Sequence, residues 1–196
     1  MLTRSLVVVA LFVSFPTIGV CHTQDSATGF LAGLLHPVTG LDHFLAMLSV
    51  GIVSAQLGGV RIFTVPAVFV VAMIIGAVTG ALGAQWPLTE AGIAMSVVVM
   101  GASIVGATEK RNSLAIMAVV ALFGSLHGHA HGLEMPTAAD PVFYAAGFLI
   151  STASIHLLGV AVGHVFKQRA SWDGVLRHMG SAMAGMGLVI LIHSLQ

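Results

Sequence analysis

Residues 34–47 read LLHPVTGLDHFLAM, and the apolar run that begins inside this stretch continues to residue 58. Three ionisable side chains, those of His36, Asp42 and His43, fall within eight positions at the start of that run. Ionisable groups inside a membrane are costly, and they usually mark a binding site or a transport pathway. The stretch therefore predicts a membrane-spanning helix that carries functional polar residues at one end.

Composition assigns the chain to the membrane class. Of its 196 residues, 57% are hydrophobic and only 7% are charged, whereas about a quarter of the residues of soluble domains are charged. The formal net charge is zero, so the chain offers no basic surface for nucleic acid. A single cysteine excludes an internal disulfide. Histidine is the exception among the polar residues, because its ten copies outnumber the seven acidic residues.

The N-terminus has the pattern of a secretory signal peptide. A short basic start is followed by an apolar run, and small residues stand at Gly19 and Cys21, where cleavage after Cys21 would require them. We expect residues 1–21 to be removed and residues 22–196 to form one membrane domain that transports metal. The alternative is that the same run stays uncleaved as a first membrane helix.

Six further segments have the length and apolarity of membrane-spanning helices, which need about 20 residues. A shorter apolar piece at 29–35 precedes the first of them, and we expect it to lie at the interface or to re-enter the membrane. The expected fold class is therefore all-α: a polytopic membrane protein with a cleaved signal peptide, this short segment and six transmembrane helices. The six segments cover residues 41–58, 62–84, 88–107, 112–131, 141–166 and 174–193.

Basic residues in the connections predict the orientation. They fall in alternate gaps between the segments, at Arg61, Lys110, Arg111, Lys167 and Arg169, and the other gaps hold no Lys or Arg. Since positive loops face the cytoplasm, we expect both the mature N-terminus and the C-terminus to lie outside. The expected location is the cytoplasmic (inner) membrane of a bacterium.

The fourth segment ends in a histidine-rich motif, HGHAHGLE, at residues 127–134. The predicted orientation places this motif at the outer side of the membrane, where the first segment begins. At about 100° per residue, His127 and His131 share one helix face, Glu134 continues that face and His129 points roughly the other way. Two stretches far apart in the sequence therefore bring ionisable residues to one membrane depth.

The start of the first segment is expected to fold back on itself. Pro37 should keep His36 out of the helical region, and Gly40 permits an unusual turn. His36 could then approach Asp42 and His43 without being fixed by helical spacing.

Imidazole and carboxylate ligands together suit borderline divalent metals such as nickel, cobalt, copper and zinc. Three or four histidines with one aspartate are therefore predicted to form a metal site, and the alternative is a set of hydrogen-bonded packing residues at the interface. His156 lies about fifteen residues into the fifth segment, or ~22 Å along a helix, and it is predicted to continue the path inward. The sequence assigns no role to His22, His164, His178 or His193.

Three stretches resemble the HupE/UreJ family of small membrane proteins, which are associated with hydrogenase and urease systems and carry nickel or cobalt. They are HPVTGLDHFLAMLSVG at 36–51, FGSLHGHAHGLEMP at 123–136 and GFLISTASIHLLG at 147–159. The resemblance covers essentially the whole mature chain, and it implies a signal peptide, six helices and permeation of a divalent metal. It implies a set of metal residues from the first, fourth and fifth helices: His36, Asp42, His43, His127, His131, Glu134 and His156.

One feature departs from the larger nickel/cobalt transporters. Their motif separates a histidine from an Asp-His pair by four residues, whereas five residues separate His36 from Asp42 and His43 here. The ligand geometry of the larger transporters therefore does not transfer directly to this chain.

The expected function is membrane transport of a divalent transition metal, most of all nickel and next cobalt. The direction is inward, and the route is secondary or facilitated because the sequence has no nucleotide-binding motif. The metal is the substrate, and the expected partners are that ion and the membrane lipid. We expect no organic cofactor, no nucleic acid and no enzymatic activity, and the sequence leaves open whether the chain forms a homo-oligomer.

Two alternatives belong to other functional classes. The first is a haem-binding membrane electron carrier, against which the carboxylates beside the histidines argue, because haem axial sites do not favour them. The second is a membrane metallochaperone or sensor that binds metal without transporting it.

Overall fold

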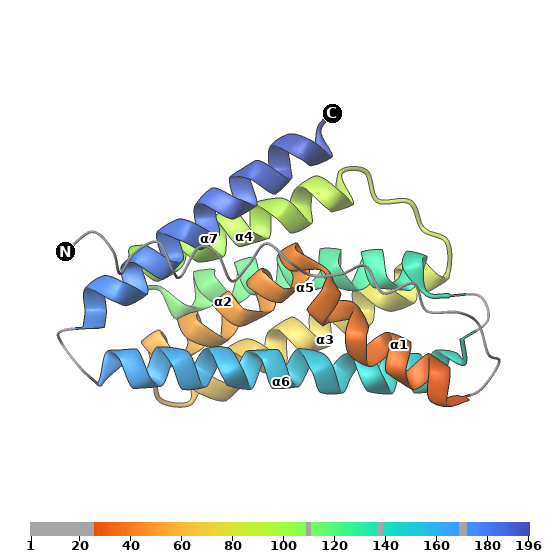
Figure 1. Cartoon of the computed structure of the whole chain (residues 1–196), viewed down its shortest axis with the longest axis horizontal. Coiled ribbons are helices and arrows are strands. Elements are labelled where there is room, and N and C mark those ends of the chain that lie inside the picture. The colour runs from red at the N-terminus through yellow and green to blue at the C-terminus, as the bar shows by residue number, and fades with distance from the viewer. Residues whose placement is uncertain (1–25, 109–110, 137–138, 169–171) are drawn as a thin grey trace, which may run out of the picture.

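The computed structural model describes residues 26–108, 111–136, 139–168 and 172–196. These residues form helices and no strand, which confirms the all-α class. The predicted signal peptide at residues 1–21 lies outside them. The helices are α1 (Ser26–Thr39), α2 (Leu41–Leu57), α3 (Arg61–Ala81), α4 (Thr89–Val105), α5 (Ser113–Glu134), α6 (Pro141–Lys167) and α7 (Asp173–Ser194) (Figure 1).

Each of the six predicted spanning segments corresponds to one helix, from α2 to α7. Among the described residues, four of these helices are long and apolar enough to cross a membrane: α3, α5, α6 and α7. A fifth span results if α1 and α2, which meet at an angle of 77°, are counted together as one broken span. A multi-pass membrane protein fits these lengths, and the number of six spans stays a prediction.

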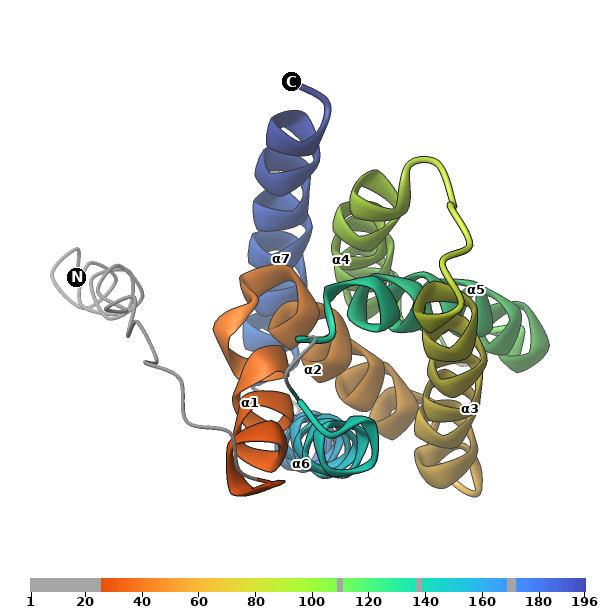
Figure 2. The same ribbon diagram turned by 90° about the vertical axis from the view of Figure 1, so that its right-hand side faces the viewer.

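Helix α2 lies at the centre of the bundle. It contacts every other described helix, and Figure 2 shows the remaining helices arranged around it. Its buried residues include Met47, Val50, Ile52 and Val53, which together cover more than one face of the helix. A helix that is buried on more than one face belongs to a protein interior. At the N-terminal end of α2, His43 is buried, whereas Leu41 is exposed.

Side-chain caps define where α5 and α6 begin. The Asn112 side chain accepts hydrogen bonds from two backbone N–H groups in the first turn of α5, and the Asp140 side chain does the same for α6. Pro141 follows at the first position of α6, where its missing N–H costs nothing. These caps satisfy backbone N–H groups in the first turn of each helix and fix where α5 and α6 begin.

The prediction that Pro37 keeps His36 out of a helix is wrong. Helix α1 runs through both residues, and the chain turns only at Gly40, whose backbone is extended. The Thr39 hydroxyl and the Gly40 N–H both donate to the His36 carbonyl and close the last turn. The preference against helix before proline is a bias, and a proline this near the C-terminal end disturbs few helical hydrogen bonds.

The segment before the first predicted span is thus a helix that packs along α6. A Cβ atom on Gly33 would overlap the backbone of Tyr144, and one on Gly147 would overlap the backbone of Phe30. These two glycines let the backbones of α1 and α6 touch, as small residues do in membrane bundles. The contact places His36 beside the central helix. The prediction of a short re-entrant or interfacial segment agrees with the sharp bend between α1 and α2.

Gly76 and Gly80 on α3 serve the close packing that their spacing predicts. A Cβ atom on Gly76 would overlap the backbone of Ser125, and one on Gly80 would overlap that of His129. Helix α3 is therefore in backbone contact with the histidine-bearing half of α5.

Candidate metal-binding site

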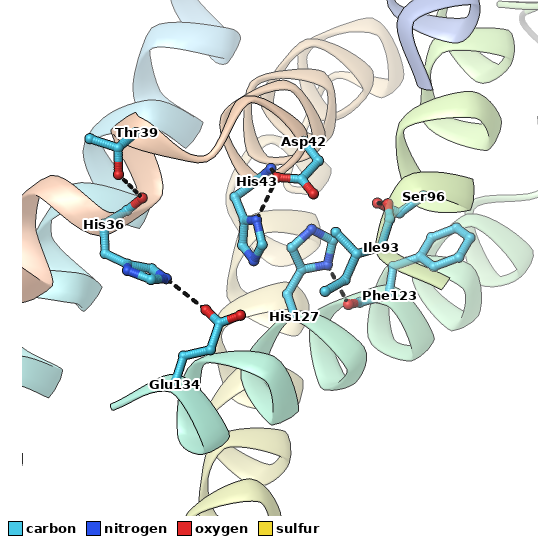
Figure 3. A network of polar contacts seen from close by, with 9 residues as sticks. All are labelled: His36, Thr39, Asp42, His43, Ile93, Ser96, Phe123, His127 and Glu134. Carbon is cyan, nitrogen blue, oxygen red and sulfur yellow. Dashed lines mark hydrogen bonds and ion pairs between the residues drawn. The ribbon is translucent and has the colours of Figure 1, made fainter. Parts of the chain in front are cut away.

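The start of α2 and the end of α5 meet and bring their histidines together. The ring centroids of His43 and His131 are 4.4 Å apart, and those of His43 and His127 are 5.0 Å apart. Figure 3 shows His43 and His127 pointing toward each other from the two helices. The meeting of these two stretches at one end of the bundle, which the orientation argument predicted, is confirmed.

Helix α1 completes the group from a third direction. The His36 ring lies 4.7 Å from the His131 ring, and its Nε2 atom lies 3.1 Å from Glu134 Oε2 (Figure 3). One ligand atom each from His36, His131 and Glu134 lies within 4.8 Å of the others. We call the set of His36, Asp42, His43, His127, His131 and Glu134 the histidine cluster.

Burial divides the cluster into a rim and an interior. The side chains of His36 and Glu134 are 32% and 47% exposed, whereas His43, His127 and His131 are buried. A cation that arrives from water would therefore meet the rim residues before the buried imidazoles.

Asp42 acts on the cluster through His43. One Asp42 oxygen accepts from the His43 backbone N–H at 2.8 Å and lies 2.7 Å from His43 Nδ1. An ionised carboxylate can only accept, so the neutral imidazole donates from Nδ1 and keeps its lone pair on Nε2. A carboxylate that orients a histidine in this way is common behind metal ligands.

The buried imidazoles of the cluster keep nitrogen atoms without a partner. His127 Nδ1 donates to the Phe123 carbonyl at 2.8 Å, which leaves Nε2 as the acceptor nitrogen. Among the described residues, His43 Nε2, His127 Nε2 and both ring nitrogens of His131 have no hydrogen-bond partner. Neutral imidazole nitrogens with free lone pairs are the form in which histidine binds metal.

His129 stands apart from the cluster, as its helical position predicted. Its ring stacks on Trp86 with centroids 4.5 Å apart and an interplanar angle of 3°. Its Nε2 atom lies 2.7 Å from the Ala84 carbonyl oxygen, and Nδ1 lies 3.2 Å from the Thr89 hydroxyl. His129 therefore holds the connection between α3 and α4 against α5.

His156 is not brought into the cluster. Its ring centroid lies 5.1 Å from that of Phe69, and the Phe69 centroid lies 5.5 Å from that of His127. Phe69 is thus in contact with both His156 and the cluster. The remaining histidines of the described helices, His164, His178 and His193, are exposed.

Two residues near the cluster were not predicted as site residues from the sequence. Glu90, in the first turn of α4, lines a cavity of about 440 Å³ that also reaches Glu134. Phe69 is fully buried against two histidines. Glu90 could have been found, because it is the one acidic residue in an otherwise apolar predicted segment. Phe69 carries no such signal, since its role depends on the packing of α3.

The opposite end of the central helix is closed by a polar network. Arg111 donates to the side chains of Gln56 and Ser103, and the Gln56 amide donates to the Ile104 carbonyl at 3.1 Å. Lys167 donates to the Gln56 carbonyl oxygen at 3.0 Å. Burial lowers the pKa of Arg111 from its ordinary value. Positive side chains thus gather at this end, and the histidine cluster lies at the other.

The sequence matches the HupE / UreJ protein family over residues 9–190. Protein HupE of Rhizobium leguminosarum bv. viciae is 37% identical over 191 residues, which cover 97% of this chain and 97% of that protein. No solved structure matches the chain. The matched range includes every residue of the histidine cluster and His156.

Proposed function

Since the chain belongs to the HupE/UreJ family, we propose that it carries a divalent transition metal, nickel in first place and cobalt next, inward across the cytoplasmic membrane of a bacterium. The family is associated with nickel and cobalt transport. The chain acts as a transporter and not as an enzyme, with the metal as its substrate. Its route is secondary or facilitated, because the sequence offers no nucleotide-binding motif to supply energy.

The observation that carries this proposal is the set of buried imidazole nitrogens without partners in the histidine cluster. A buried polar group that lacks a hydrogen bond costs about 1–3 kcal/mol. Residues that served only packing would be expected to satisfy these nitrogens, as Phe123 does for His127 Nδ1. A divalent cation gives several of them a ligand bond at once, which supports metal binding over the packing alternative.

The rim and the interior of the cluster have different tasks in this proposal. His36 and Glu134 capture the hydrated cation, because both are partly exposed and one is anionic. His131 belongs to both groups, since it lies beside His36 and beside His43. The cation then passes to His43 and His127, where imidazole replaces part of its water shell.

Asp42 supports the buried part of the site by charge and by orientation. Its hydrogen bond with His43 Nδ1 presents Nε2 to the metal. Its negative charge also offsets the positive charge of the cation in a region from which most water is excluded.

The geometry favours a small cation over haem. The ring centroid of His43 lies 4.4 Å from that of His131, at an interplanar angle of 59°, and 5.0 Å from that of His127, at an angle of 77°. A macrocycle needs a wide flat cavity between two axial ligands, and the carboxylates of Asp42 and Glu134 stand beside these rings. This arrangement supports transport or binding of a bare metal ion.

Reconstitution of the purified full chain in liposomes tests the proposal. Radioactive nickel should accumulate inside these vesicles faster than in protein-free vesicles, and cobalt should compete better than copper or zinc. Binding of nickel with no accumulation would favour the metallochaperone or sensor. A haem band in the visible absorption spectrum of the purified chain would favour the electron carrier.

A further inference from the structure

Thr152 and His156 on α6 are buried polar residues that the protein leaves unsatisfied. Thr152 is fully buried, and His156 is only 2% exposed. The Thr152 hydroxyl oxygen and both ring nitrogens of His156 have no hydrogen-bond partner in the described part of the chain. Three buried polar atoms on neighbouring turns of one helix thus lack a partner.

The free hydroxyl of Thr152 differs from the usual behaviour of a hydroxyl in a helix. Ser and Thr side chains in helices commonly donate to a carbonyl oxygen three or four residues earlier. The buried hydroxyls of Ser49, Ser54 and Ser96 all do so, at 2.6 to 2.7 Å, and so does the exposed hydroxyl of Ser154. The unpartnered Thr152 hydroxyl is therefore free to bind a ligand.

The two residues share one face of α6. They are four positions apart, so their Cβ atoms lie about 5–6 Å from each other on the helix surface. Phe148 is one turn before Thr152 on the same face, and its ring lies 4.1 Å from the ring of His131 in the histidine cluster. This face of α6 therefore leads from the cluster toward His156.

Phe69 connects this face to the cluster. It is fully buried and in ring contact with both His127 and His156. Within the described part of the chain, His156 makes ring contact with Phe69 and with no histidine of the cluster. A cation bound between Thr152 and His156 would thus occupy a position distinct from one bound in the cluster.

We propose that Thr152 and His156 form a second site for the transported divalent transition metal, which we call the inner site. The cation takes one imidazole nitrogen and the threonine hydroxyl oxygen as ligands, and water completes its shell. This inference rests on the proposed transport function.

The ligands of the inner site make it suited to release. Both are neutral, whereas the cluster contains the carboxylates of Asp42 and Glu134. Imidazole suits nickel and cobalt, and a hydroxyl is a weaker ligand for them. A permeation pathway needs sites that bind strongly enough to admit the ion and weakly enough to let it leave. The inner site fulfils the second condition and gives the cation a second binding position outside the cluster.

The test compares four variants of the full chain in liposomes. Thr152→Val keeps the shape and removes the hydroxyl, Thr152→Ser keeps the hydroxyl, and His156→Gln removes the imidazole. Ser154→Ala is the matched control, because it removes an exposed hydroxyl from the same helix. The measurements are the maximal rate of radioactive nickel uptake and the equilibrium binding of nickel to the purified chain at the histidine cluster.

We expect the maximal uptake rate to fall about tenfold in Thr152→Val, as loss of one ~1.4 kcal/mol interaction would give, and further in His156→Gln. Thr152→Ser and Ser154→Ala should transport within about twofold of wild type. Nickel binding at the cluster should be unchanged in all four, which also shows that they fold.

Two outcomes would overturn the inference. One is a maximal uptake rate in Thr152→Val and His156→Gln that equals the wild-type rate. This result would overturn the inner site alone. The other is an equal loss of nickel binding and uptake in both variants, which would assign the residues to packing. Failure of the wild-type chain itself to take up nickel would overturn the proposed function, and the inner site with it.

Discussion

The Nε2 atom of His36 lies 3.1 Å from the Oε2 atom of Glu134, which joins α1 to the end of α5 at the rim of the histidine cluster. The hydrogen bond to the Glu134 carboxylate requires a proton on Nε2, so a cation can bind this nitrogen only after that proton has left it. Protons and metal ions therefore compete at the first residues that an arriving cation meets.

This competition predicts the direction of the pH dependence. Only neutral imidazole binds metal, and an ordinary histidine titrates near pH ~6.5. Nickel affinity should therefore fall when the pH drops from about 7.5 to about 5.5, measured by equilibrium binding at both pH values. An affinity that stays constant or rises in acid would contradict a histidine-based site.

Asp42→Asn should abolish most uptake while the protein level stays near normal. The amide keeps the shape of the side chain but removes the charge that favours a divalent cation. Loss of a carboxylate that supports a metal-binding histidine typically costs 10–100-fold in affinity or activity. The measurement is the rate of radioactive nickel uptake per amount of protein in the membrane.

Asp140→Asn is the matched control for this charge change. Asp140 caps α6 from outside the cluster, and asparagine caps helices about as well as aspartate. Uptake should therefore stay near the wild-type rate in Asp140→Asn. An equal loss in both variants would show that net charge, and not the position of Asp42, limits uptake.

His129→Ala should reduce uptake less than His131→Ala does. His129 faces Trp86 and the Ala84 carbonyl, so its loss should lower the melting temperature more than nickel affinity. His131 has two free nitrogens in the cluster, so its loss should lower affinity. Thermal unfolding and nickel binding on the same purified samples separate the two effects. Equal loss of nickel affinity in both variants would contradict the assignment of His129 to packing.

Most of the fold could be predicted because hydropathy and charge act locally along a chain. Each apolar segment became one helix, since a run of about 20 apolar residues has few alternatives. The meeting of His43 with His127 and His131 followed from the alternating basic connections and from helical spacing. Both predictions needed only distances along the sequence.

The features that the sequence predicted wrongly or did not predict depend on contacts between helices. Pro37 was expected to break the helix, but the close contact of Gly33 with α6 accompanies a helix that continues to Thr39. The contact of Phe69 with two histidines depends on the packing of α3 against α5 and α6, which one sequence does not reveal. The lengths of α2 and α4 leave the number of spans as a prediction.

Accessibility labelling tests the predicted orientation. In a Cys21→Ser chain, a cysteine at Thr108 should resist a membrane-impermeant thiol reagent in intact cells, and one at Ala138 should react. The reason is that the basic connection between α4 and α5 is expected in the cytoplasm. Thr108 is chosen because it is exposed and, unlike Asn112, does not cap α5. Labelling at Thr108 in intact cells would contradict the predicted orientation and the inward direction of transport.

The central claim is that the histidine cluster binds the metal that the protein transports. The most direct measurement is the initial rate of radioactive nickel uptake into liposomes that contain the wild-type chain or the His43→Ala/His131→Ala double variant. The cluster account predicts that the double variant, folded and inserted at the same level, loses at least about 100-fold, since two imidazole ligands leave the site. Uptake by the double variant at the wild-type rate would contradict the account and would show that His43 and His131 serve only packing.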